Sequence, residues 1–122
     1  MKRRSLMSLL LFLIVFSMIS CAPQRMYYWG DYSNTLYAVR KDANDETLLK
    51  HQKALEQIIE ESNTRNLRVP PGVYAELGYI YFKQNKKDMA VKYFDLEAKT
   101  YPESQVLMSR LTQAANAKTN KD

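Results

Sequence analysis

The stretch that decides the fold is PGVYAELGYIYFKQNKKDMAVKYFDLEAKTYPES, residues 71–104. Its apolar and aromatic residues recur every three or four positions on both sides of a polar turn at 85–87, as in two amphipathic helices. Pro71 suits the first turn of the first helix, because proline lacks the backbone N–H that would be unpaired there. Asp88 suits the cap of the second helix. Gly78 costs about 1 kcal/mol relative to alanine inside a helix, which indicates close approach of a partner helix.

The spacing of these residues resembles the tetratricopeptide repeat, a helical hairpin of about 34 residues. Seven positions match the aromatic, small and proline positions of that repeat: Tyr74, Leu77, Gly78, Tyr81, Ala90, Phe94 and Pro102. Glu97 departs from the pattern, because the repeat usually has a small residue there. The packing of the second helix against a following helix therefore stays open.

The resemblance implies that the face of the first helix with Ala75, Tyr79, Phe82 and Lys83 lines a groove. Tyr79 and Phe82 are three residues apart and hence on one side of a helix. Two aromatic rings beside a lysine predict a binding site for a peptide or helix of a partner protein. The equally open alternative is that packing against a helix at 46–62 buries these rings.

The rest of the chain is also helical in pattern, with low glycine and few β-branched runs. We expect a short helix at 33–41 capped by Ser33 or Asn34, and a capping turn at 42–45. A longer helix at 46–62 follows, with an apolar stripe formed by Leu48, Leu55, Ile58 and Ile59. A polar loop at 63–69 is expected to end this helix, and Pro70 and Pro71 prevent the helix from continuing.

A closing helix is predicted at 103–117, because a repeat array needs a cap over its last exposed face. Its apolar side consists of Val106, Leu107, Leu111, Ala114 and Ala115. The expected fold is therefore all-α, a short tetratricopeptide-like hairpin array of about four to five helices. Its parts are a degenerate hairpin at 33–69, the repeat at 71–104, and a capping helix and tail at 105–122.

Residues 1–20 have the order of an export signal: the basic head Lys2, Arg3 and Arg4, an apolar run at 9–19, and then Ser20. A membrane-spanning anchor is the alternative, but the apolar run is shorter than the roughly 20 residues that a span needs. Of the 18 Lys and Arg residues three lie in this signal, which leaves 15 against 13 Asp and Glu and lowers the net charge from +5 to +2. The small remaining excess argues against nucleic-acid binding.

Residues 18–21, Met-Ile-Ser-Cys, resemble the lipobox of bacterial lipoproteins. The resemblance implies that Cys21 is lipidated and becomes the first residue of the mature protein. Each buried acyl CH₂ contributes about 0.8 kcal/mol, so several chains anchor a protein firmly. Cys21 is also the only cysteine, so no intrachain disulfide is possible. In the lipoproteins that this motif resembles, Asp after the cysteine causes retention in the inner membrane, so Ala22 implies the outer membrane. We expect the domain to face the periplasm, with exposure at the cell surface as the alternative.

Four aromatic residues follow within twelve residues of Cys21: Tyr27, Tyr28, Trp29 and Tyr32. Gly30 and Asp31 predict a turn between them. Three interpretations are open: the rings cover the domain as a lid, lie at the lipid headgroups, where Trp and Tyr are favoured, or dock a partner.

The lipobox, residues 28–32 and the pair Leu36-Tyr37 together resemble a family of small uncharacterised lipoproteins of Gram-negative bacteria. Members are short, helical and tetratricopeptide-like, and are typically encoded beside a lipoprotein resembling the curli secretion channel. The resemblance implies a place in a cell-envelope complex and supplies no catalytic residues.

No constellation for catalysis, a cofactor or a metal is visible in the sequence. The three glycines are far apart, and His51, the only histidine, has only Cys21 as a possible companion ligand or nucleophile. We interpret His51 as a partly buried residue at a helix contact. The predicted function is a non-catalytic adaptor that binds a protein partner, another envelope lipoprotein or a second copy. The predicted alternative is a structural lipoprotein that contacts peptidoglycan or lipid through Tyr28, Trp29 and Tyr32.

Overall fold

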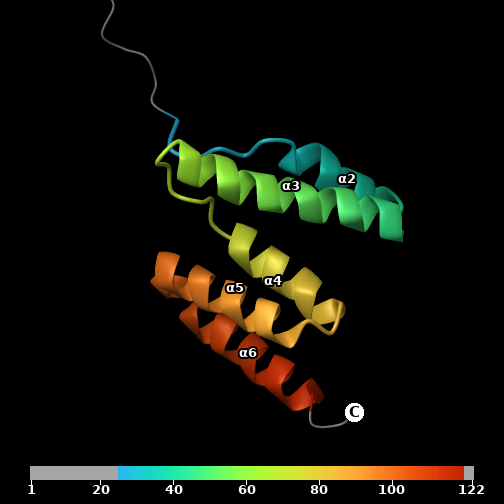
Figure 1. Ribbon diagram of the computed structural model, residues 1–122, viewed down its shortest axis with the longest axis vertical. Coiled ribbons are helices and arrows are strands. Elements are labelled where there is room, and N and C mark those ends of the chain that lie inside the picture. Colours follow the sequence, from blue (N-terminus) through green and yellow to red (C-terminus); the bar gives the residue numbers. More distant parts are fainter. Residues whose placement is uncertain (1–24, 120–122) are drawn as a thin grey trace, which may run out of the picture.

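The computed structural model describes residues 25–119, and this part of the chain is all-helical. Its five helices are α2 (Tyr32–Lys41), α3 (Asp45–Thr64), α4 (Val73–Lys83), α5 (Lys87–Thr100) and α6 (Gln105–Thr119), with a 3₁₀ turn at Pro102–Ser104. Figure 1 shows α2 lying along α3 at one end of a stack, α4 and α5 following, and α6 closing the other end. The expected all-α hairpin array is confirmed. The predicted signal peptide and Cys21 lie outside the described residues.

The α4–α5 hairpin is the most closely packed pair of helices. Leu77, Ala90 and Phe94 are completely buried between them, as the repeat pattern predicts. A Cβ atom placed on Gly78 would lie 2.8 Å from Cδ1 of Phe94, closer than real Cβ atoms come. The prediction that Gly78 permits close approach of the partner helix is confirmed.

The starts of α4 and α5 differ from the sequence prediction. Pro71 precedes α4 by two residues, and the N-cap is Gly72, whose φ of +88° is a left-handed conformation that glycine adopts without strain. Lys86 is the N-cap of α5, so Asp88 lies within the first turn and does not cap the helix. A carboxylate in that turn still interacts favourably with the helix dipole.

Glu97, the departure from the repeat pattern, is a buried residue with a clear structural role. Its Oε1 accepts a hydrogen bond from the backbone N–H of Gly72 at 2.8 Å, and its Oε2 accepts one from Ala75 at 3.3 Å. The first backbone N–H groups of a helix have no partner within the helix. Glu97 of α5 therefore caps α4, and α5 still packs against α6.

Helix α3 begins with a capping box between Asn44 and Thr47, as the predicted capping turn requires. Leu55 and Ile58 are fully buried on its inner side. The prediction was wrong for Leu48, which is exposed. Because α4 has 11 residues against 20 in α3, α4 leaves the first turns of α3 partly uncovered.

The ends of the array show two further corrections. Helix α2 begins one residue earlier than expected and Asp31 is its N-cap, so neither Ser33 nor Asn34 caps it. The Asn34 side chain instead donates to Oδ1 of Asp31 at 2.6 Å.

In α6 the predicted apolar side was partly wrong, because the buried residues are Met108 and Ala115, while Val106, Leu107 and Ala114 are exposed. Because residues 106–108 are three consecutive apolar residues, the sequence does not show which side of this helix faces the core.

Within residues 25–119, no helix is long and apolar enough to span a bilayer.

Candidate functional site

A groove lies between the first turns of α3 and the last turns of α4, at the right-hand ends of these helices in Figure 1. Its volume is about 580 Å³, and seven residues line it: Asp45, Leu48, Leu49, Tyr79, Ile80, Lys83 and Gln84. We call it the α3–α4 groove. Its lining residues come from the start of α3 and the end of α4, which are at least 30 positions apart in the sequence. The groove therefore exists only in the folded protein.

The walls of the α3–α4 groove are apolar and accessible. Leu48 is 40% exposed, Leu49 50% and Tyr79 48%. Asp45 in the first turn of α3 and Lys83 in the last turn of α4 place opposite charges on the two walls. Such a surface suits a segment that presents apolar side chains flanked by charges of both signs.

The structure brings together two of the four groove residues that the sequence predicted, and Ala75 instead is partly buried and packs against the core. Tyr79 and Lys83 line the groove, whereas Phe82 is half-buried and packs against the core, with its ring centroid 6.1 Å from that of Tyr79. Packing against the core therefore covers Phe82 in part and leaves Tyr79 accessible.

Leu48 and Leu49 were missed as lining residues. Adjacent residues on a helix point about 100° apart, so a Leu-Leu pair at a helix start signals that one of the two lies off the core face.

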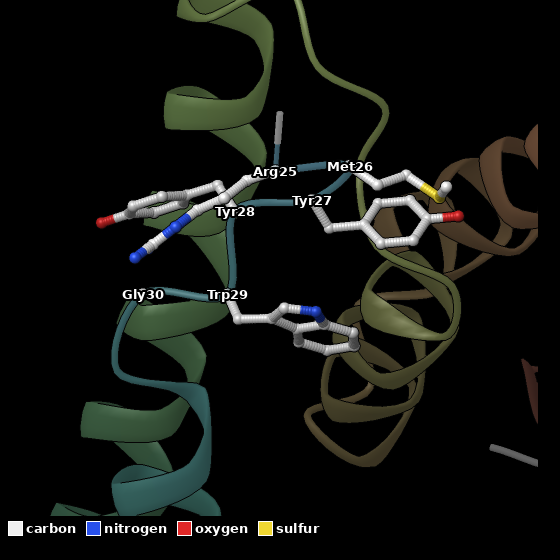
Figure 2. A pocket seen from close by; sticks show the side chains of 6 residues that line it. All are labelled: Arg25, Met26, Tyr27, Tyr28, Trp29 and Gly30. Carbon is white, nitrogen blue, oxygen red and sulfur yellow. The ribbon is translucent and has the colours of Figure 1, made fainter. Parts of the chain in front are cut away.

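The aromatic segment that precedes α2, residues 25–29, has no regular secondary structure, and its side chains point to two sides. Figure 2 shows Met26, Tyr27 and Trp29 on one side of the segment, and Arg25 and Tyr28 on the other. The Tyr28 ring lies under the guanidinium of Arg65, which follows the last residue of α3. The Cζ atom of Arg65 is 4.5 Å from the centroid of the Tyr28 ring.

Tyr27 holds the opposite side of the segment through a side-chain hydrogen bond with Tyr101. At its end the segment turns at Gly30, whose φ is +44°, so the predicted turn is confirmed.

Trp29 and Tyr32 continue the aromatic contacts toward α3. Their ring centroids are 5.2 Å apart, and the Tyr32 ring is 5.6 Å from that of His51. Tyr28 and Tyr32 pack against the core, as the lid interpretation expects. Trp29 keeps 41% of its surface exposed, and Met26 keeps 72%. Tyr27, Tyr28 and Tyr32 thus attach the segment to the domain, while Arg25, Met26 and Trp29 stay accessible.

His51 lies at a contact of three helices, as its interpretation from the sequence expected. It is only 2% exposed. Its Nε2 is 3.0 Å from Oε1 of Glu76 on α4, and its Nδ1 is 2.8 Å from the hydroxyl of Thr35 on α2. The Tyr32 hydroxyl donates to the other Glu76 oxygen at 2.9 Å. These four side chains join α2, α3 and α4.

The network satisfies His51 in both of its protonation states. In the neutral ring, Nε2–H donates to Glu76 and the Thr35 hydroxyl donates to Nδ1. In the charged ring, Nδ1–H donates to Thr35, whose own proton turns to the Asp31 carbonyl at 3.0 Å or the Tyr32 carbonyl at 3.1 Å. Every buried polar side-chain atom of this cluster has a hydrogen-bond partner, so the four side chains join the three helices without an unsatisfied group.

Two pKa shifts follow from the network. Burial raises the pKa of Glu76, but hydrogen bonds from His51 and Tyr32 and the charges of His51 and Arg40 outweigh burial, so the net pKa is lowered. Burial and the hydrogen bond to Glu76 raise the pKa of Tyr32 to about 12.

Within residues 25–119, no three His, Cys, Asp or Glu side chains are grouped as metal ligands. Cys21, the predicted lipid attachment site, lies outside the described residues.

One comparison with known proteins gave a match. The model of a protein family described as "Domain of unknown function (DUF4810)" matches residues 26–111, from the aromatic segment into α6. No curated protein and no solved structure matches the chain.

Proposed function

We propose that this chain, which belongs to the family described as a domain of unknown function (DUF4810), is a non-catalytic adaptor of the cell envelope. In this proposal a protein partner binds the α3–α4 groove, while Cys21 anchors the domain in the outer membrane, facing the periplasm. The observation that carries the proposal is the groove itself: two leucines and a tyrosine, each 40–50% exposed, between walls of opposite charge.

The chemistry of the groove supports a protein partner. A large accessible ring beside two accessible leucines offers a desolvation gain of the kind that dominates protein interfaces, where aromatic residues are enriched. Asp45 and Lys83 orient a partner by charge more than they add affinity. The best-fitting partner segment presents an apolar stripe with a basic residue toward Asp45 and an acidic residue toward Lys83.

The anchor part of the proposal rests on the lipobox resemblance of residues 18–21 and on Ala22. Lipidation of Cys21 is expected to hold the chain on the membrane, because each acyl CH₂ buried in the bilayer contributes about 0.8 kcal/mol. Palmitate labelling of cells tests it directly. Label should enter the wild-type protein and be absent from Cys21→Ser.

The short array supports the need for a partner. Repeat units bury their hydrophobic faces against neighbours, and arrays of fewer than about three repeats are marginal. Here α6 leaves Val106 and Leu107 exposed at one end, and the α3–α4 groove is open at the other. The resemblance to small envelope lipoproteins favours another lipoprotein as the partner, and self-association is the second possibility.

Co-purification tests the adaptor function. We would express wild type, the double variant Leu49→Ala/Tyr79→Ala and the control Tyr37→Ala, cross-link intact cells, and purify the protein from envelopes. Tyr37 is a matched control because it is 67% exposed but lies on α2, outside the groove.

The double variant should lose the partner at least ten-fold, and Tyr37→Ala should retain it. Equal recovery with all three proteins, or recovery of a monomer alone from wild type, would contradict the adaptor function.

A further inference from the structure

We propose that Arg25, Met26 and Trp29 contact the lipid surface to which Cys21 is attached, so that the domain is held against the bilayer in a fixed orientation. This inference rests on the proposed lipidation of Cys21. It concerns a surface formed by residues 25–29, none of which lines the α3–α4 groove.

The length of chain between the anchor and the domain sets the first constraint. Arg25 follows Cys21 by only four residues. Four residues span at most about 14 Å even when fully extended. A lipid on Cys21 therefore brings Arg25 and the residues after it close to the headgroup region.

The three side chains have the chemistry of a headgroup contact. Trp29 has an apolar body with one N–H donor and is 41% exposed, and tryptophan is enriched at membrane–water interfaces. Met26 is 72% exposed and can enter the acyl boundary. Arg25 is exposed and can pair with a lipid phosphate.

The remaining aromatic rings hold this surface in place. Tyr28 is fixed against Arg65, Tyr27 against Tyr101, and Tyr32 against Glu76. Figure 2 shows Met26 and Trp29 directed to the same side of the segment, around a hollow of about 520 Å³ that residues 25–30 line. Because the backbone is already ordered, contact with lipid requires little additional loss of conformational entropy.

The lipid contact and the groove are separate. Tyr28 contacts Arg65 near the end of α3, whereas Leu48 lies near its start. Seventeen residues of helix separate Leu48 and Arg65, or about 26 Å at 1.5 Å per residue. Trp29 lies nearer the middle of α3, since its ring contacts Tyr32, whose ring is 5.6 Å from that of His51. None of residues 25–30 lines the groove. Figure 1 shows the N-terminal segment running along α3 from its left-hand end toward its middle, whereas the groove lies at the right-hand end. Membrane contact and partner binding can therefore occur together.

Trp29 is the only tryptophan in the chain, so its fluorescence reports this surface alone. We would purify the full-length protein from membranes and reconstitute it into vesicles of phosphatidylethanolamine and phosphatidylglycerol, with and without bromine on the acyl chains. Bromine quenches only tryptophan that lies near the acyl chains. We expect at least a two-fold loss of Trp29 emission in brominated vesicles, together with a blue shift relative to detergent-free, lipid-free protein.

A matched control moves the tryptophan to position 79 on α4, in the α3–α4 groove. The variant Trp29→Phe/Tyr79→Trp should show emission that bromine leaves unchanged and that acrylamide in the buffer quenches. If bromine does not quench Trp29, the proposal is overturned. The result would have this meaning both for a chain that is not attached to lipid and for an attached domain that is held away from the bilayer. Equal quenching at both positions would overturn the fixed orientation.

A cell-wall contact is distinguished by sedimentation of Cys21→Ser with peptidoglycan sacculi. Binding that disappears in Cys21→Ser/Trp29→Ala would assign this surface to peptidoglycan and overturn the lipid contact. Loss of partner capture in Leu49→Ala/Tyr79→Ala with unchanged quenching of Trp29 would leave the lipid contact standing independently of the adaptor function.

Discussion

His51 and Glu76 form a buried polar contact between α3 and α4, with Nε2 of the imidazole 3.0 Å from Oε1 of the carboxylate. Through Tyr32 and Thr35 the same contact extends to α2. The helix that carries the N-terminal aromatic segment is thereby joined to the helix that carries Tyr79.

His51→Ala should lower the free energy of unfolding by about 2–3 kcal/mol. The substitution leaves a cavity at a buried site and removes one of the two donors to the partly buried Glu76 carboxylate, of which only the Tyr32 hydroxyl remains. His51→Gln retains an amide donor and should lose less. Urea unfolding followed by circular dichroism measures both, and a loss below about 0.5 kcal/mol for His51→Ala would show that the contact is not stabilising.

Stability should fall in acid because of Glu76. Its pKa in the folded protein is lowered from 4.5, so the folded state binds this proton less readily than the unfolded state does. The contribution is therefore complete above about pH 4.5 and is lost as the pH falls through the folded-state pKa. Urea midpoints of wild type and Glu76→Gln between pH 3 and 7 test this. The urea midpoint of Glu76→Gln should fall less steeply than that of wild type as the pH is lowered. An equally steep fall in both proteins would refute the contribution of Glu76 to the acid dependence.

Gly78→Ala should destabilise the protein even though alanine is the better helix former. The propensity gain is about 1 kcal/mol, but the new methyl group would lie 2.8 Å from the fully buried Phe94 ring, and overpacking typically costs about 1–3 kcal/mol. We expect a net loss of about 1 kcal/mol. Combining it with Phe94→Leu should recover part of that loss in a double-mutant cycle. A stabilised Gly78→Ala would mean that α4 and α5 are further apart than described.

Glu97→Ala should lower the free energy of unfolding by about 2–3 kcal/mol, because it leaves the N–H groups of Gly72 and Ala75 without their acceptor. Glu97→Gln retains one acceptor oxygen and should lose about half as much. Thermal unfolding followed by circular dichroism separates the two variants. If alanine is tolerated as well as glutamine, solvent rather than Glu97 caps α4.

The sequence predicted the α4–α5 hairpin well because its information is local. Leu77, Gly78, Ala90 and Phe94 follow from helical spacing and from the size limits of a close helix contact. Contacts between polar residues far apart in the chain were not predictable. Nothing in the spacing shows that Glu97 reaches back 25 residues to Gly72.

The candidate site was only partly predictable for a related reason. Tyr79 and Lys83 could be identified from the face of one helix. The opposite wall, with Leu48 and Leu49, depends on how α3 and α4 cross and on the difference in their lengths. The prediction of which side of α6 is buried was partly wrong because three apolar residues, Val106, Leu107 and Met108, are consecutive. In the structure α6 packs against α5, and of the three only Met108 is buried.

The measurement that tests the central claim most directly is site-specific photo-cross-linking in intact cells, with a photoreactive phenylalanine at position 79 or position 37. Both positions carry exposed tyrosines, but only Tyr79 lines the α3–α4 groove. The account predicts one discrete cross-linked envelope protein, or a second copy of this chain, from position 79, and at least ten-fold less from position 37. Absence of a product from position 79, or equal products from both positions, would contradict the groove as the partner-binding site.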